Sequence, residues 1–137
     1  MILLLTGTAT AAQAAAAHAT ADHATVLAAW DCPAGNLCVW NGYGGTGSRC
    51  SWSDADNDWG AAPVICSWAP YNKVKSIYNR GQSTSFLGVM LYTAANYPSN
   101  GIWGCEAQGS KFTFISGVSD GVWLASHRWT NSFPYCT

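Results

Sequence analysis

The chain carries two copies of one pattern, set a little over fifty residues apart, within a length of 137 residues. Each copy begins with an apolar run that ends in an aromatic residue, passes through a turn to a cysteine, and closes on a segment containing a serine. A repeat of this length in a short chain predicts two similar supersecondary units stacked on each other. The corresponding positions are Trp40 and Tyr92, Cys50 and Cys105, and Ser76 and Ser126, which lie 52, 55 and 50 residues apart.

Short apolar runs separated by clusters of Gly, Asn, Ser and Pro predict an all-β chain. The run from Lys111 to Ile115 alternates cleanly between polar and apolar residues, as a half-buried strand should. Together with the repeat, this pattern predicts a double Greek-key sandwich of about four strands in each half. The expected strands are Leu37–Trp40, Arg49–Trp52, Val64–Trp68, Val74–Tyr78, Phe86–Tyr92, Lys111–Ile115 and Val122–Trp129, with a weaker one at Ile102–Cys105.

The first thirty residues differ in composition from the rest of the chain. An apolar run at residues 2–5 leads into a long Ala/Thr stretch with small-x-small sites around Ala17 and Ala19, which is typical of a secretory signal. No Lys or Arg precedes the run, so we expect the signal to be truncated or to start upstream; an Ala-rich tail is the alternative. We expect a signal-like segment at 1–21, a linker at 22–31, and one domain at 32–137 with halves at about 32–82 and 83–137.

Six cysteines in the predicted domain also indicate secretion, because an even count in a short, weakly charged domain is typical of a disulfide framework. No C-x-x-C pair is present, so a zinc site is not expected. The count alone does not choose the pairing. The Pro and Gly between Cys32 and Cys38 turn the chain back and favour a local bridge there. One bridge in each half then completes the expected set, which is Cys32–Cys38, Cys50–Cys66 and Cys105–Cys136.

Charge excludes one class of partner. Only 9% of the residues are charged and the net charge is -1, so the basic stripe that nucleic-acid binding needs is missing. We expect a monomer with no nucleic-acid partner and, after signal cleavage, no membrane partner. The eight Trp and six Tyr are expected mainly in the core. An aromatic platform for glycans or cell-wall polymer is the alternative function, and Trp103, Trp123 and Trp129 are its candidates.

Three motifs carry a family resemblance: CPAGNLC at 32–38, the W-x-x-Y-x-G turn that starts at Trp40, and VKSIYNRG at 74–81. In this order they resemble the secreted inhibitor family typified by the streptomycete metalloproteinase inhibitor. LYTAANY at 91–97 and ASHRW at 125–129 match more loosely. The resemblance implies a βγ-crystallin-like fold, a non-enzymatic and secreted peptidase inhibitor, an extracellular peptidase as partner, and no cofactor. It also implies a metalloproteinase as the target.

This chain departs from the family in its second half. The resemblance implies a reactive bond within a tight disulfide loop that begins near Cys105, but residues 106–110 contain no second cysteine. The candidate inhibitory segment is therefore the one just before Cys105, where a proline restricts the unbound chain and large apolar residues could fill specificity pockets. An ordinary connection with Ile102 and Trp103 packed inward is the alternative. The candidate residues are Tyr97, Pro98, Asn100, Gly101, Ile102 and Trp103.

Two other patterns suggest a site but miss a required residue. Asp54, Asp56 and Asp58 alternate as in the opening of a calcium loop, yet Trp59 stands where the loop needs Gly and Ile65 where it needs Glu. We therefore interpret them as a solvated acidic loop and expect no metal. His127 is the one histidine of the predicted domain, and no nucleophile motif accompanies it. The sequence thus predicts no catalytic residue.

Overall fold

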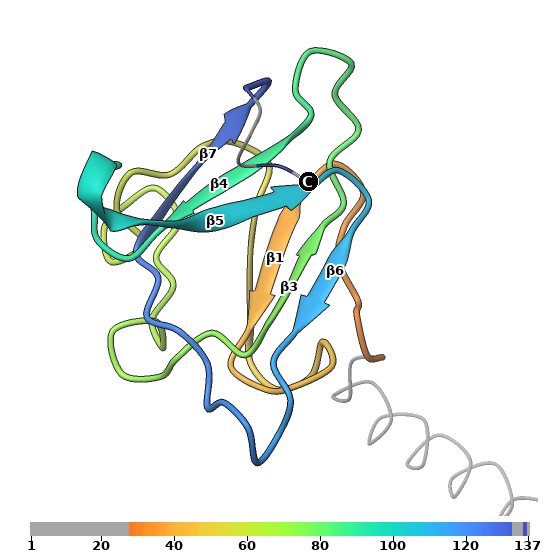
Figure 1. The fold of residues 1–137 in the computed structure, drawn as a ribbon, viewed down its shortest axis with the longest axis vertical. Coiled ribbons are helices and arrows are strands. Elements are labelled where there is room, and N and C mark those ends of the chain that lie inside the picture. The colour runs from red at the N-terminus through yellow and green to blue at the C-terminus, as the bar shows by residue number, and fades with distance from the viewer. Residues whose placement is uncertain (1–27, 133–135, 137) are drawn as a thin grey trace, which may run out of the picture.

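The computed structural model describes residues 28–132 and residue 136, and within them the chain forms two antiparallel sheets (Figure 1). The first sheet has the strand order β2-β1-β3-β6 and the second the order β5-β4-β7. The described residues contain one 3-10 turn, η1, and no α-helix. The elements are β1 (Leu37–Trp40), β2 (Arg49–Trp52), β3 (Ser76–Asn79), β4 (Gly88–Tyr92), η1 (Ser99–Gly101), β5 (Ile102–Ala107), β6 (Lys111–Thr113) and β7 (Ser126–Thr130).

The sequence repeat is present in the strand pairing. In each half the first strand is central, with its hairpin partner on one side and the last strand of the same half on the other. Trp40 lies opposite Ser76 in the first half, and Tyr92 lies opposite Ser126 in the second. The predicted all-β, disulfide-stapled fold is confirmed, while the Greek-key wiring of each half stays a prediction.

Each half also supplies one segment to the sheet of the other half. Strand β6, from the second half, pairs with β3 in the first sheet, with Phe112 opposite Ile77. In return, Asp56 of the first half forms an isolated bridge with His127 on β7, through N–H to C=O bonds of 3.0 and 2.9 Å. The exchange joins the two halves around one core. Buried Leu37, Val39, Ile77, Val89, Leu91 and Leu124 belong to that core.

The predicted strand at Val64–Trp68 is wrong. These residues form bends and turns, and the side chains of Val64 and Ile65 are 39% and 61% exposed. β-branched residues favour strands only where a neighbouring strand and a packed face receive them, and exposed Val64 and Ile65 have no neighbouring strand among the described residues. Elsewhere the error is in the boundaries, as at Val74, which makes an isolated bridge to Val122 ahead of β3.

Trp30, within the expected linker, contacts the domain. Its ring packs edge-on against Trp40 and Tyr78, and its N–H donates to the Gly45 carbonyl at 2.9 Å. The domain boundaries stay a prediction. The signal-like segment predicted at 1–21 lies outside the described residues. No helix in the described part of the chain is long and apolar enough to cross a bilayer.

All six cysteines are paired as predicted. The bridges are Cys32–Cys38, Cys50–Cys66 and Cys105–Cys136. The first closes the loop that leads into β1. The second links β2 to Cys66, and the third links β5 to Cys136 near the C-terminus. Each bridge is expected to contribute about 2–4 kcal/mol to the stability of a domain this small.

Candidate functional site

The predicted inhibitory segment forms the connection between β4 and β5. Thr93 N–H donates to the Gly101 carbonyl at 2.8 Å, and Gly101 N–H donates to the Pro98 carbonyl at 2.9 Å, so the segment folds back on itself as η1. A Cβ atom at Gly101 would lie 2.8 Å from Pro98 Cγ, which makes glycine necessary in this turn. Ser99 and Asn100 are exposed at its tip. The segment is a compact turn rather than an open loop.

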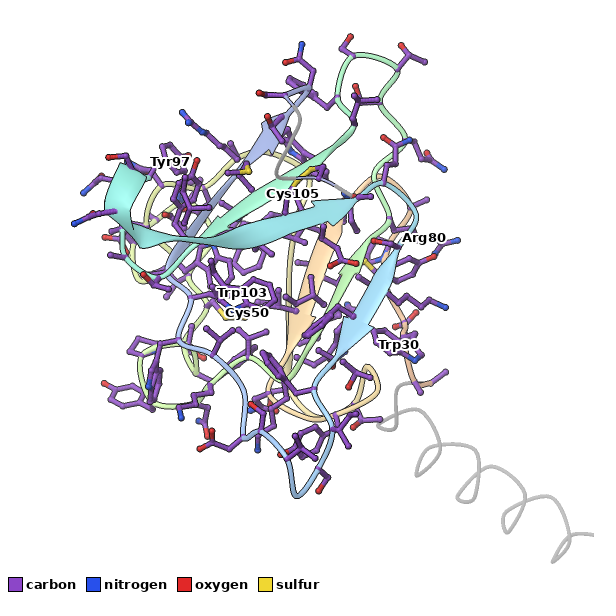
Figure 2. The ribbon with its side chains drawn as sticks, viewed as in Figure 1. Trp30, Cys50, Arg80, Tyr97, Trp103 and Cys105 are labelled. Atoms are coloured by element: carbon purple, nitrogen blue, oxygen red, sulfur yellow. A yellow bond between two sulfur atoms is a disulfide. The ribbon has the colours of Figure 1, made fainter. Side chains whose placement is uncertain are left out.

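Tyr97 is held at the start of this turn by aromatic and charged neighbours. Its ring lies 5.4 Å from the ring of Tyr92, and the Arg128 guanidinium lies 5.4 Å from the centre of the Tyr97 ring (Figure 2). Arg128 also donates from Nε to the Tyr92 hydroxyl at 2.8 Å. Partial burial and, next, the Asp56 carboxylate raise the pKa of the Tyr97 phenol. Tyr97 is thus a neutral, packed side chain.

Trp103 points into the protein. Its ring centre lies 5.5 Å from that of Phe112 and 6.0 Å from that of Phe114, and it packs against the main core (Figure 2). Ile102 beside it is partly buried. The structure therefore corresponds to the alternative stated for these two residues, because Trp103 is partly buried and packs inward among aromatic neighbours. A role of this segment in inhibition stays a prediction, and its exposed surface is the tip at residues 99–100.

The three aspartates of the acidic loop do not converge on one point. Asp56 Oδ1 accepts the Asp58 N–H at 2.9 Å, and Asp58 Oδ1 accepts the Gly60 N–H at 2.9 Å. Asp54 accepts a bond from the Ser53 hydroxyl at 3.3 Å. No cluster of three or more His, Cys, Asp or Glu able to hold a metal occurs in the described part of the chain. The carboxylates of Asp56 and Asp58 thus cap main-chain N–H groups of their own segment.

A second exposed segment follows this acidic loop at residues 60–65. All six of its residues are exposed, whereas Trp59 before it is 1% exposed and Cys66 after it is fully buried. The Cys66 N–H donates to the Trp59 carbonyl at 2.8 Å and closes the base of the loop. The sequence interpretation assigned part of this loop to a strand. One sequence signal points to this loop: Pro63 is followed by two apolar residues and then directly by Cys66.

The base of this loop is anchored in the core by Trp59. Its main-chain N–H donates to the Ala125 carbonyl at 2.9 Å, and its indole N–H donates to His127 Nδ1 at 2.9 Å. His127 is fully buried, and this burial lowers the pKa of its imidazole to about 4. The histidine is a neutral packing residue whose two ring nitrogens are both hydrogen-bonded.

The tryptophans do not form the exposed platform that glycan binding would use. Trp123 is 47% exposed and lines a cavity of about 220 Å³ together with Pro70 and Thr93. Trp103 and Trp129 are partly buried and pack against the core. The other five tryptophans are buried or partly buried. Trp123 is thus the one exposed tryptophan of the described residues, and a single indole does not make an aromatic patch on which sugars could stack.

Comparisons with known proteins identify the family. Residues 27–106 match the family described as peptidase inhibitor family I36. No curated protein and no solved structure matches the chain significantly. The matching stretch spans more than half of the chain and includes β1 to β4, all of β5 but its last residue, the loop at 60–65 and the turn at 97–103. This chain therefore belongs to peptidase inhibitor family I36, and it is a proteinaceous inhibitor of peptidases rather than an enzyme.

Proposed function

We propose that this inhibitor is secreted and acts on an extracellular metallopeptidase. The observation that carries the proposal is the family match over residues 27–106 in a domain braced by three disulfides. Inhibitors that occupy an active-site cleft need a rigid framework, because a flexible loop would lose conformational entropy on binding and would be cut as a substrate. The two sheets and three bridges provide such a framework.

The disulfides and the surface support the proposed location. Disulfides form and persist in oxidising surroundings outside the cytosol, and every cysteine of this chain is paired. The low share of charged residues agrees with a small extracellular domain stabilised by cross-links. An extracellular peptidase is then the partner that the protein would meet.

The exposed apolar residues support the proposed target class. Metallopeptidases of the thermolysin type cut beside large apolar residues, so an inhibitor that occupies their cleft should present such a residue on an accessible loop. Several are exposed here, among them Ile65 and Leu87. The Arg or Lys that a trypsin-like enzyme would select is missing from the two segments considered above, residues 60–65 and 97–103.

The proposal is tested by titrating the purified, oxidised protein against a thermolysin-type metallopeptidase and a subtilisin-type serine peptidase. We expect stoichiometric loss of metallopeptidase activity, and we expect reduction and alkylation of the cysteines to abolish it, because the framework would be lost. Chelation of the enzyme's metal by the inhibitor is checked by adding excess zinc and calcium, which should not restore activity. Absence of inhibition in both enzyme classes at micromolar protein would reject the proposed function.

A further inference from the structure

We infer that the loop Gly60–Ile65 is the part of this protein that enters the active-site cleft of the target peptidase, with Val64 and Ile65 in its apolar pockets. The inference rests on the inhibitory function proposed above and adds the contact residues to it. It concerns a segment different from the one that the sequence analysis favoured, residues 97–103.

The loop combines an exposed surface with a fixed base. Six consecutive exposed residues leave the protein after buried Trp59 and return to it at buried Cys66. Three bonds fix the two ends: the disulfide Cys50–Cys66, the main-chain bond from Cys66 to Trp59, and the bond from the Trp59 indole to His127. A loop held in this way has already lost much of its conformational entropy before it binds.

The acidic loop adds order on the N-terminal side. The Asp58 carboxylate accepts the Gly60 N–H at 2.9 Å, and the Asp58 carbonyl accepts the Ala61 N–H at 3.0 Å. Pro63 restricts the chain at the centre of the loop. The aspartates that resembled a calcium loop therefore serve to shape the first turn of this segment.

Beyond Ala61 the main chain of the loop is free to pair with a partner. Within the described part of the chain, the backbone groups of Ala62, Val64 and Ile65 make no hydrogen bond. Val64 and Ile65 are also large apolar side chains left in solvent, and they stand next to each other. Peptide-binding clefts engage a guest through main-chain hydrogen bonds, and pockets for its side chains supply specificity. A segment with unpaired backbone groups and adjacent apolar side chains is therefore suited to bind in such a cleft.

Other exposed apolar residues lack this combination. Leu87 donates its N–H to Thr130 and accepts from Gln108, so its main chain is already paired. The Ile115 carbonyl already accepts from Val118 and Ser119 within a turn, and this turn lies outside the family match. The loop at 60–65 is inside the match, and the Cys50–Cys66 bridge is attached directly at its end.

The spanning disulfide predicts how the protein behaves if the peptidase cuts the loop. Hydrolysis of a peptide bond between Gly60 and Ile65 consumes one water and leaves a carboxylate and an amine. Cys50 lies before the cut and Cys66 after it, so the two parts remain covalently joined. A cut at Gly101–Ile102 would leave no bridge between its two parts, because Cys105–Cys136 lies wholly on one side. The position of the cut is therefore readable from the covalent state of the product.

The first experiment compares three variants of the full chain by inhibition constant against a thermolysin-type metallopeptidase. Ile65→Asp should weaken inhibition at least about 30-fold, as expected for removal of an anchor residue. The matched control is Ile115→Asp, which places the same charge at a comparably exposed isoleucine, 67% against 61%, and should change inhibition by less than about 2-fold. Ile102→Asp tests the segment at 97–103, and thermal melts verify that each variant is folded.

The outcomes separate this inference from the function on which it rests. If the parent chain inhibits the peptidase and Ile65→Asp inhibits equally well, the inference is overturned and the proposed function stands. If Ile102→Asp abolishes inhibition and Ile65→Asp does not, the contact is assigned to residues 97–103 and the inference is again overturned. A parent chain that inhibits no peptidase would overturn the function and the inference together.

A second experiment reads the loop directly, without any variant. The inhibitor is incubated for a long period with the peptidase and analysed by mass spectrometry before and after reduction. We expect a product heavier by one water that stays in one piece until reduction and then separates into two, with the new N-terminus at Val64 or Ile65. Fragments that separate without reduction, or a new terminus at Ile102, would overturn the assignment.

Discussion

Trp59 and His127 are hydrogen-bonded to each other in the core, with 2.9 Å between the indole nitrogen and Nδ1 of the imidazole. The indole can only donate, so Nδ1 accepts, and the proton of the neutral ring is on Nε2, which donates to the Asp54 carbonyl at 2.9 Å. This hydrogen bond joins the first-half segment that follows β2 to β7, the last strand of the second half. Buried Trp59 directly precedes the exposed loop at residues 60–65.

Acid should destabilise the protein through His127. Burial lowers the pKa of the folded imidazole from 6.5 to about 4. Between pH 6.5 and pH 4 the histidine is therefore protonated in the unfolded chain and neutral in the folded chain. This contribution is fully present above pH 6.5 and is lost as the pH falls toward 4, which amounts to about 3 kcal/mol. Urea unfolding measured from pH 7.5 to pH 4 checks the prediction.

Two variants isolate the histidine from other titrating groups. Burial raises the pKa of the Glu106 carboxyl, so its protonation favours the folded state toward low pH and opposes the effect of His127. Glu106→Gln should therefore steepen the acid loss. His127→Gln should lower stability at pH 7.5 but flatten the profile between pH 6.5 and 4. An unchanged profile in His127→Gln would show that another group controls the acid sensitivity.

Trp103 should prove to be a structural residue. Truncation of a ring packed between Phe112, Phe114 and the core leaves a cavity, and Trp103→Ala should lower the free energy of unfolding by about 3 kcal/mol. The control is Trp123→Ala, at a half-exposed position, which should change it by about 0.5 kcal/mol or less. Denaturant unfolding of both variants makes the comparison. Equal, small effects would mean that Trp103 is not packed as described.

The two equivalent serines should differ in their contribution to stability. Ser126 donates to the Ala94 carbonyl at 2.6 Å, whereas Ser76 donates to the Gly42 carbonyl at 2.7 Å and also accepts the Gly45 N–H at 2.9 Å. Both residues are fully buried. With about 1 kcal/mol for each bond, Ser76→Ala should cost about twice as much as Ser126→Ala.

Exposed Ser116→Ala serves as the baseline for these two variants in the same denaturant series. A Ser126→Ala variant as stable as the Ser116→Ala control would contradict the pairing of that hydroxyl with Ala94.

Calcium should leave the stability unchanged. The carboxylates of Asp56 and Asp58 accept main-chain N–H bonds instead of converging on a shared point. A cation that binds only the folded state would raise the melting midpoint as its concentration exceeds its dissociation constant. We therefore expect midpoints within about 1 °C of each other in millimolar calcium and in chelator. A clear rise with calcium would show a site that the arrangement of these aspartates does not suggest.

Several features were readable from the sequence because they depend on local pattern. The repeat spacing predicted that Trp40 and Tyr92 would be equivalent, and each indeed lies opposite the serine of its own half. The cysteine pairs followed from proximity along the chain and one bridge for each half. Apolar runs between turn residues placed the strands to within a few positions, since alternation and turn chemistry act over neighbouring residues.

Only the tertiary structure decided which apolar residues are exposed. Val64 and Ile65 have the composition of a strand, and the sequence left open whether Trp103 is exposed or packed inward. The first two side chains are exposed, whereas Trp103 is partly buried and packs against the core. The difference arises from the exchange of segments, which brings Phe112 of β6 beside Trp103 and bridges Asp56 to His127. Strand pairing and burial require partners distant in the sequence, and no local pattern states whether a segment will meet them.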